Sequence, residues 1–229
     1  MNSKSDAAND PLHELVMRGD NDALAEYFQQ NERRLRRLIE LRMDSRLQQR
    51  ASASDVLQEA FVDLAQQYEA YLEDPQLPLY VWVRRVTGQR LSKFHRRHLG
   101  TAKRDAGREV ALNHQPMPAA TSAILAGQLA ASITAAEQKL IREEQQHRMD
   151  EVLNDLHEED REVIAMRNFE QLTNAEVAAA LEISESAAGM RYMRAIRKLQ
   201  KAMKRHMQLF ETNSLEELLS QPSPTFGEN

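Results

Sequence analysis

The chain has 229 residues, of which 41% are hydrophobic, 28% charged and only 5% aromatic, and its 30 Lys and Arg against 35 Asp and Glu give a formal charge of −5. This length predicts one or two small domains, and the absence of cysteine excludes a disulfide framework, a thiolate zinc site and a cysteine nucleophile. Because the few glycines and prolines favour helix almost throughout, and no run of about 18 uncharged apolar residues is present, we expect an all-α, cytoplasmic protein with no membrane segment.

The first half of the chain predicts a compact helical domain over residues 11–99, after a disordered lead of residues 1–10. Pro11 suits the first position of a short helix, and apolar residues at three-and-four spacing predict a second helix from about residue 20 to Arg42. Ser52 or Ser54 then caps a third helix. Its buried stripe is expected to be Val56, Leu57, Ala60, Phe61, Leu64, Ala65 and Tyr68, and its outer face Asp55, Gln58, Glu59 and Asp63.

A loop from Glu73 to Pro78 ends this helix, because proline disfavours helix for the residue before it. A further helix is expected over residues 79–99, with basic residues between inward-facing apolar ones. Trp82 belongs to that apolar stripe, and we expect it in the core rather than stacked on a ligand. The inward residues are Val83, Val86, Leu91 and Phe94.

The second half predicts a linker over residues 100–133, a helical domain over residues 134–207 and a mobile tail over residues 208–229, with one short helix in the tail. The second domain opens with Thr134 and Glu137 at the spacing of a capping box. Helices are then expected to about residue 156 and over 159–168, 174–181 and 184–207, with Thr173 and Ser184 as caps. A short turn between a small helix and a longer basic one is typical of a helix-turn-helix.

The charge is unevenly distributed. Residues 84–104 hold eight Lys or Arg and residues 186–206 hold seven, and neither segment has an acid. The rest of the chain has 15 basic against 35 acidic residues, a charge of −20. Two acid-free segments in an acidic chain indicate contact with a polyanion. A weaker cluster at residues 33–37 is interpreted as a solvated helix face.

Several motifs resemble the small two-domain sigma factors of the extracytoplasmic function (ECF) group in the sigma-70 family. Asp55-Val-Leu-Gln-Glu-Ala-Phe61 is similar to that family's D-V-x-Q-E-x-F helix, and Trp82-Val-x-x-Val86 to its W-L-x-x-I stretch. The segments 160–167, 173–178 and 181–184 are similar to its C-terminal helix-turn-helix. The order and spacing of these motifs extend the resemblance over about residues 20–205.

The resemblance implies a subunit that binds core RNA polymerase, recognises two promoter elements and performs no catalysis. It implies polymerase contact by Asp55, Gln58 and Glu59. It implies that Gln89, Arg90, Lys93, Arg96 and Arg97 bind the minus-ten element, although Lys93 stands where many relatives have Asp. The loop 73–78 would line a pocket for an unstacked base.

For the minus-thirty-five element the resemblance implies Ser186, Arg191, Arg194, Arg197 and Lys198. The sequence differs from the family at two places in the helix-turn-helix. Gly189 and Met190 occupy positions that often carry a basic residue and a serine, and Glu182 replaces the usual turn glycine. If that turn needs a positive φ, the glutamate costs stability.

Three other functions are compatible with parts of the sequence. A helix-turn-helix regulator that binds operator DNA without polymerase explains the second domain but not the motifs of the first. An enzyme would need a catalytic or metal site, and neither the scattered carboxylates at 150–160 nor His95 and His98 suggests one, so we expect no catalytic residue, metal or cofactor. A protein that regulates a sigma factor is the third. The expected partners are core RNA polymerase, promoter DNA and an anti-sigma or other regulatory protein. As a hypothesis, the free chain masks its cationic segments by docking its own domains or an inhibitor.

Overall fold

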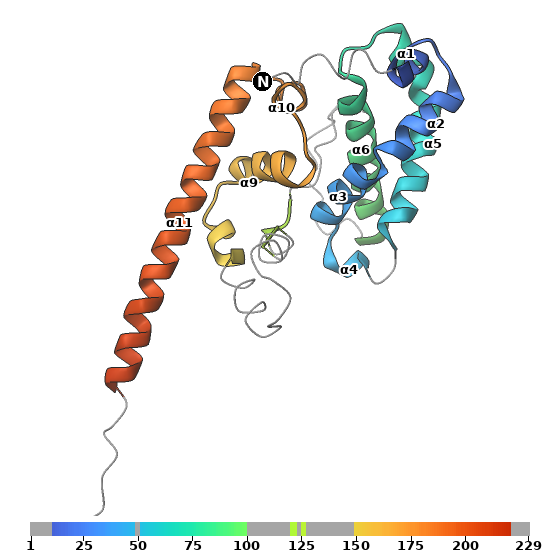
Figure 1. The fold of residues 1–229 in the computed structure, drawn as a ribbon. Helices are drawn as coiled ribbons and strands as arrows, with labels where there is room; N and C mark the ends of the chain where they lie inside the picture. Colours follow the sequence, from blue (N-terminus) through green and yellow to red (C-terminus); the bar gives the residue numbers. More distant parts are fainter. Residues whose placement is uncertain (1–10, 49–50, 100–119, 123–124, 127–148, 221–229) are drawn as a thin grey trace, which may run out of the picture.

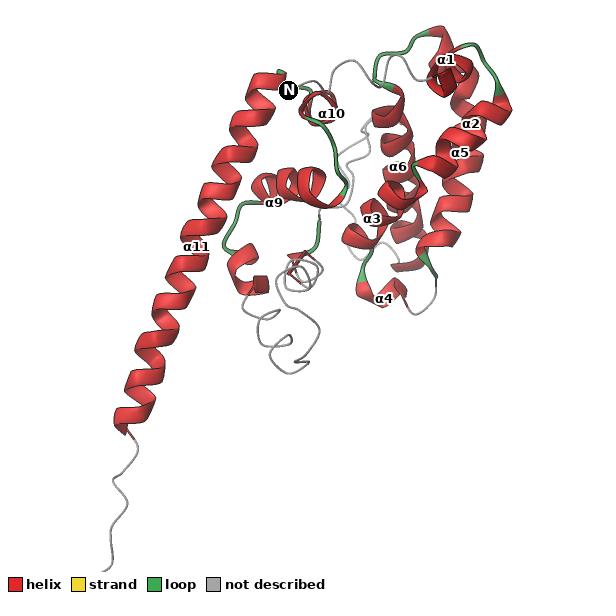
Figure 2. Cartoon of the chain, viewed as in Figure 1, coloured by secondary structure: helices red, strands yellow, loops and turns green. Residues whose placement is uncertain are grey.

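The computed structural model describes residues 11–48, 51–99, 120–122, 125–126 and 149–220, with the backbone alone for 206–220. All regular structure in these residues is helical (Figure 2), which confirms the all-α class. Helices α1 to α6 form one bundle, α9 and α10 lie between it and α11, and α11 is the long helix at the opposite side of the molecule (Figure 1).

The first bundle consists of α1 (Pro11–Met17), α2 (Asn21–Gln30), α3 (Glu32–Arg42), α4 (Ser45–Gln48), α5 (Ala53–Glu73) and α6 (Leu79–Leu99). The single helix expected from residue 20 to Arg42 is wrong, because the chain breaks at Asn31. The Asn31 side-chain amide donates to the Tyr27 carbonyl at 2.9 Å, a local bond of the kind by which asparagine competes with helical hydrogen bonding. The break separates α2 from α3.

Helix α5 starts as expected at a serine cap. The Ser52 hydroxyl accepts from the Asp55 N–H, and the Asp55 carboxylate accepts from the Ser52 N–H at 2.7 Å, so the two residues form a capping box. The predicted outer face is wrong at Asp63, whose side chain is 7% exposed. A buried carboxylate needs a partner, and Arg90 and Lys93 of α6 supply its ion pairs.

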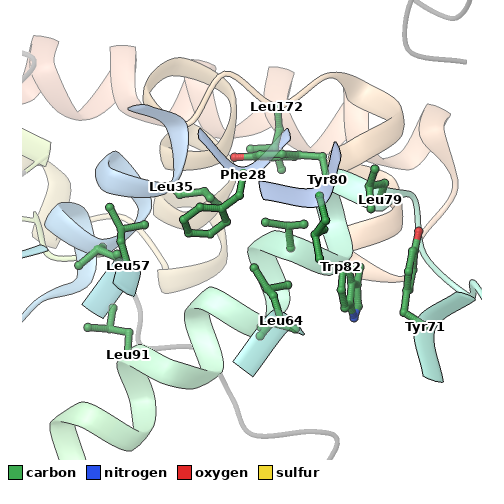
Figure 3. Packing of buried hydrophobic residues seen from close by; sticks show 14 of the residues in the cluster. Phe28, Leu35, Leu57, Leu64, Tyr71, Leu79, Tyr80, Trp82, Leu91 and Leu172 are labelled. Atoms are coloured by element: carbon green, nitrogen blue, oxygen red, sulfur yellow. The ribbon is translucent and has the colours of Figure 1, made fainter. Parts of the chain in front are cut away.

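The core of the bundle is continuous from α1 to α6 (Figure 3). Trp82 is 8% exposed, and its ring stacks on Tyr71 with a centroid distance of 4.2 Å, so its predicted place in the core is confirmed. Val83, Val86, Leu91 and Phe94 are also buried as expected. In α5 the expected stripe is wrong at Ala65, which is exposed, and Phe61 is only half-buried.

The second half contains a helix at 149–154, then α9 (Glu158–Ile164), a π-helical turn η1 (Ala165–Phe169), α10 (Asn174–Leu181) and α11 (Glu185–Ser220). Helix α11 continues to Ser220, beyond residue 207, where the sequence predicts the second domain to end. Between Gly189 and Pro222 the sequence has neither glycine nor proline, so no strong helix breaker lies in this stretch. The Thr134–Glu137 capping box lies outside the described residues.

The two halves share their hydrophobic cores. Met166, Leu172 and Val177 pack in one cluster with the α1–α6 bundle, and Leu41 of α3 packs in a second with α9 and α11. The expected self-docking of the domains is therefore present in the structure. Most of the predicted linker lies outside the described residues, and the domain boundaries stay predictions. None of the described helices combines the length and hydropathy that crossing a membrane requires.

The turn between α10 and α11 holds a strained residue. Glu182 has φ 56° and ψ 41°. This is the left-handed conformation, in which a residue other than glycine is expected to cost stability. We expect Glu182→Gly to raise the free energy of unfolding by about 1 kcal/mol, because glycine relieves this strain. Urea denaturation measures the change. Glu182→Val is the matched variant and should lower the stability, since a β-branched residue fits this region least; a Gly variant no more stable than the Val variant would contradict the strain.

Candidate nucleic-acid interface

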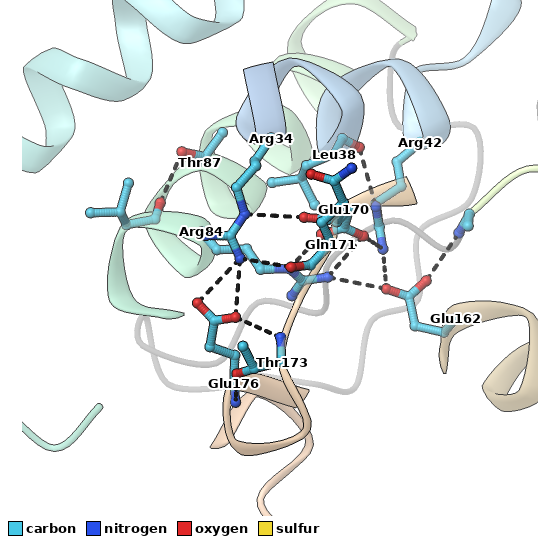
Figure 4. Close-up of polar contacts among 12 residues, drawn as sticks. Arg34, Leu38, Arg42, Arg84, Thr87, Glu162, Glu170, Gln171, Thr173 and Glu176 are labelled. Atoms are coloured by element: carbon cyan, nitrogen blue, oxygen red, sulfur yellow. Dashed lines mark hydrogen bonds and ion pairs between the residues drawn. The ribbon is translucent and has the colours of Figure 1, made fainter. Parts of the chain in front are cut away.

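Arginines of the first bundle meet glutamates of the second half at a buried junction (Figure 4). Glu170 is fully buried and accepts from the Nε of Arg84 at 2.6 Å, while Arg42 reaches its other oxygen at 2.7 Å. Glu162 pairs with the same two guanidinium groups. We call the six residues that form this contact the arginine–glutamate junction: Arg34, Arg42, Arg84, Glu162, Glu170 and Glu176.

Burial and charge oppose each other at Glu170. Burial alone would raise the pKa of its carboxyl, but the positive charges and hydrogen bonds of Arg42 and Arg84 outweigh burial and lower the pKa from 4.5 to about 2. Burial likewise opposes the charge of Arg84, and the Glu170 carboxylate keeps the Arg84 pKa above its usual value. Glu170 and Arg84 therefore stay ionised at neutral pH.

Arg34 extends the junction toward the helix-turn-helix. Its guanidinium donates to the Glu170 and Gln171 carbonyls at 3.1 and 3.3 Å and pairs with Glu176 at 3.1 Å. The guanidinium also lies 3.5 Å from the centre of the Tyr80 ring, a cation–π contact. Arg34 thus contacts both halves of the molecule, and the interpretation of its arginine cluster as a solvated helix face is wrong here.

The junction was not predicted from the sequence, although a signal for it was present. Arg42 lies seven residues after Leu35, and Arg84 lies four residues after Tyr80, so both occupy the buried stripe of their helix. A charged residue in an apolar stripe requires a buried counter-charge. The sequence offers no comparable signal for Glu170, which follows a π-helical turn.

The residues predicted to bind polymerase lie at the start of α5. Asp55 and Gln58 are exposed, and Glu59 is half-buried and pairs with Arg90 at 3.1 Å. Hydrogen bonds from the Ser52 backbone and hydroxyl lower the pKa of the exposed Asp55 carboxyl. Asp55 and Glu59 therefore also have structural contacts, whereas Gln58 presents an exposed side chain.

The predicted minus-ten residues lie on α6 and divide into two kinds. Arg90 and Lys93 are ion-paired with Asp63 of α5. Gln89 is half-buried, and Arg96 and Arg97 are exposed near the C-terminal end of the helix. Arg85, from the same acid-free segment, pairs with Glu182 at 3.1 Å. In this arrangement the exposed cations of α6 are concentrated in its last turns.

The predicted minus-thirty-five residues divide in a similar way on α11. Ser186, Arg194 and Arg197 line an open groove of ≈1030 Å³ between α10 and α11, together with Asn174, Glu185, Gly189, Met190 and Met193. Arg191 and Lys198 lie on the neighbouring side and pair with Glu159 at 3.8 Å and Asp160 at 2.5 Å on α9. The predicted caps Thr173 and Ser184 fix the two helix starts that border this groove, and Thr173 forms a capping box with Glu176.

The described residues offer no metal site, since no three His, Asp or Glu side chains in them are grouped as ligands. His95 is half-buried, and burial lowers the pKa of its imidazole while the Asp44 charge opposes that change. The His98 ring packs on Phe94 at 4.3 Å between centroids. The two histidines therefore have separate local contacts.

The helix-turn-helix half matches a known family. Residues 146–199 match the family described as sigma-70, region 4. A solved structure of CnrH in complex with the cytosolic domain of CnrY is 18% identical, covers 85% of this chain and 96% of that chain, and has a TM-score of 0.49. No curated protein matches the sequence. The region 4 match covers α9, α10 and the groove-lining part of α11.

Proposed function

We propose that the chain is a sigma factor of the ECF type, which binds core RNA polymerase, recognises minus-ten and minus-thirty-five promoter elements and promotes initiation of transcription. The observation that carries this proposal is the exposed cationic face of α11 inside the region 4 match. Helix-turn-helix domains place their second helix in the major groove. The exposed cations at the end of α6 supply a second surface that suits DNA, on the other half of the chain.

The two surfaces can reach both elements only if the arginine–glutamate junction opens. Elements near positions −10 and −35 lie about 25 base pairs apart, or about 85 Å at about 3.4 Å per pair. Helix α6 has 21 residues and so spans about 30 Å, and its Arg85 lies 3.1 Å from Glu182 in the helix-turn-helix. We therefore propose that the docked structure is the free form, and that the polymerase-bound form is extended.

We propose that binding of a partner protein opens the arginine–glutamate junction. The junction contains no thiol, and its central pair of Glu170 and Arg84 keeps its charges at neutral pH, so redox change or a small pH shift would leave that pair intact. Core RNA polymerase and an anti-sigma or other regulatory protein are the proposed partners that would change its state. In this proposal the protein has no catalytic role.

Transcription in vitro tests the proposal. Purified core RNA polymerase is given genomic promoter fragments with and without the full chain, and new start sites are mapped. A sigma factor should bind core polymerase stably and produce start sites that depend on it. Specific DNA binding without any association with core polymerase would instead favour an operator-binding regulator.

Gln58 provides the cleanest test of polymerase contact. We expect Gln58→Lys to weaken the affinity for core polymerase about 10-fold, a typical effect of truncating or reversing a contact residue at an interface, with unchanged thermal stability because the side chain is exposed. Asp55 and Glu59 are less suitable, because charge reversal there also breaks the capping box or the Arg90 pair.

The control for this substitution is Glu69→Lys, which adds positive charge on an exposed position three turns further along α5. Fluorescence anisotropy with labelled chain measures both affinities. Equal weakening by the two variants would indicate a general charge effect and remove the assignment of Gln58.

A further inference from the structure

The groove between α10 and α11 has an apolar centre. Among the described side chains, the large hydrophobic ones that are most exposed are Leu15, Val62, Met190 and Met193. Met190 and Met193 are 58% and 50% exposed, and both line the groove. Two exposed methionines three residues apart on one helix face form a small apolar surface where a solvated helix would carry polar residues.

Helical spacing places these methionines in the middle of the groove-lining face of α11. Ser186, Met190, Met193 and Arg197 follow one another at intervals of four, three and four residues, so they share one face of the helix. Arg194 lies beside them on the same face. Arg191 and Lys198 face α9 instead, where they are ion-paired. The exposed face therefore consists of two methionines bordered by arginines.

The missing side chain at Gly189 widens the same groove. A Cβ atom at this position would lie 3.6 Å from the Nδ2 of Asn174, in ordinary contact, so the glycine is not required by close packing. Gly189 thus lines the groove beside Asn174 and Met190 without adding a side chain to it. The flexible methionine can then adapt to the shape of what it contacts.

The positive charge around the groove indicates which kind of ligand binds there. Residues 186–206 contain seven basic residues and no acid, and the groove lies at the N-terminal end of α11, where the helix dipole is positive. A neutral apolar peptide gains nothing from this charge. Duplex DNA combines a polyanionic backbone with one apolar group at the base edges of the major groove, the C5 methyl of thymine.

We propose that Met190 and Met193 determine part of the DNA sequence preference by contacting thymine methyl groups in the minus-thirty-five element. This inference rests on the proposed function, because it requires α11 to enter the major groove. Arg194 and Arg197 then contact phosphates or guanine at either side. The minus-thirty-five element is accordingly rich in thymine at the base pairs that the middle of the groove-lining face of α11 contacts.

Replacing thymine by deoxyuridine tests the proposal, because it removes the methyl group and leaves every hydrogen-bonding group in place. Duplexes are selected from a random pool by the full chain with core RNA polymerase, and each conserved thymine is replaced in turn. We expect about 4-fold weaker binding at one or two positions, the effect of one buried methyl group. In a Met190→Ala/Met193→Ala variant, the same replacements should have no effect.

Two control variants complete the design. Met190→Leu keeps an apolar side chain and should keep the sensitivity to deoxyuridine, and Leu15→Ala removes an exposed apolar side chain on α1 and should behave as the unchanged protein. This inference alone is overturned if no thymine of the selected sequence responds to replacement by deoxyuridine, or if the double variant responds as strongly as the unchanged protein. Failure to select any sequence overturns the sigma-factor function and this inference together.

Discussion

Replacing Glu170 by alanine is expected to separate the two halves of the molecule and to lower the free energy of unfolding by about 3–5 kcal/mol, the cost of leaving buried charges without a partner. The carboxylate is fully buried and serves both Arg42 and Arg84. Without it, two guanidinium groups that are at most 5% exposed have Glu162 as their one remaining carboxylate partner among the described residues. They can regain water only if the helices α3 and α6 part from the second half.

Small-angle scattering and urea denaturation measure the two parts of this prediction. The radius of gyration should increase, and the second half should unfold at a lower urea concentration than before. Glu182→Ala is the matched control at the same interface, because the pair that it breaks with Arg85 is exposed and worth about 0–1 kcal/mol. Equal effects of the two substitutions would contradict a special role of the buried carboxylate.

The same residue sets the pH dependence of docking. Because the pKa of Glu170 is lowered from 4.5 to about 2, its contribution is complete above about pH 4.5 and is lost as the pH falls toward about 2. Scattering from the unchanged protein should therefore show opening only in acid. Glu170→Gln has no carboxyl to titrate, so its radius should be larger at neutral pH and depend less on pH over this range.

The helices could be predicted from the sequence because their signals are local. Capping residues such as Ser52 and Thr173 and the buried stripe around Trp82 depend only on neighbours within one or two turns. The extent of α11 was not predicted. Proline, serine and glycine near the C-terminus favour a mobile tail, but between Gly189 and Pro222 neither glycine nor proline interrupts the helix. Composition alone is a weaker signal than the absence of glycine and proline.

The site could be predicted only in part because contacts between distant residues decide which charges are exposed. Asp63 has the spacing of an outer residue, yet Arg90 brings it into the protein from 27 positions away. Likewise Arg84 belongs to a segment that its charge predicts to bind DNA. Its pairing with Glu170 becomes visible only in the folded structure, where the two halves meet. Charge counts located the two basic segments but could not separate structural arginines from available ones.

The distinction between structural and available arginines predicts the second large effect, which concerns the arginines of α11. We expect Arg194→Ala combined with Arg197→Ala to reduce promoter-dependent transcription about 30-fold or more, since each lost contact to a base edge or phosphate costs about 1–3 kcal/mol. Both side chains are exposed and line the groove, so folding and core polymerase binding should be unchanged. Transcription from a selected promoter and anisotropy with core polymerase measure the two quantities.

Arg191→Ala is the comparison that uses the structure most directly. Arg191 carries the same charge on the same helix, but it lies 3.8 Å from Glu159 and faces α9. Loss of Arg191 should weaken DNA binding less than loss of either groove arginine, and it should weaken binding to all sequences alike. If Arg191 contacts one phosphate, the slope of log affinity against log salt concentration should decrease in magnitude by about 1. A larger or sequence-dependent loss for Arg191 would mean that α11 rotates relative to α9 when it binds DNA, because only rotation or breakage of the Glu159 pair would bring this side chain to the bases.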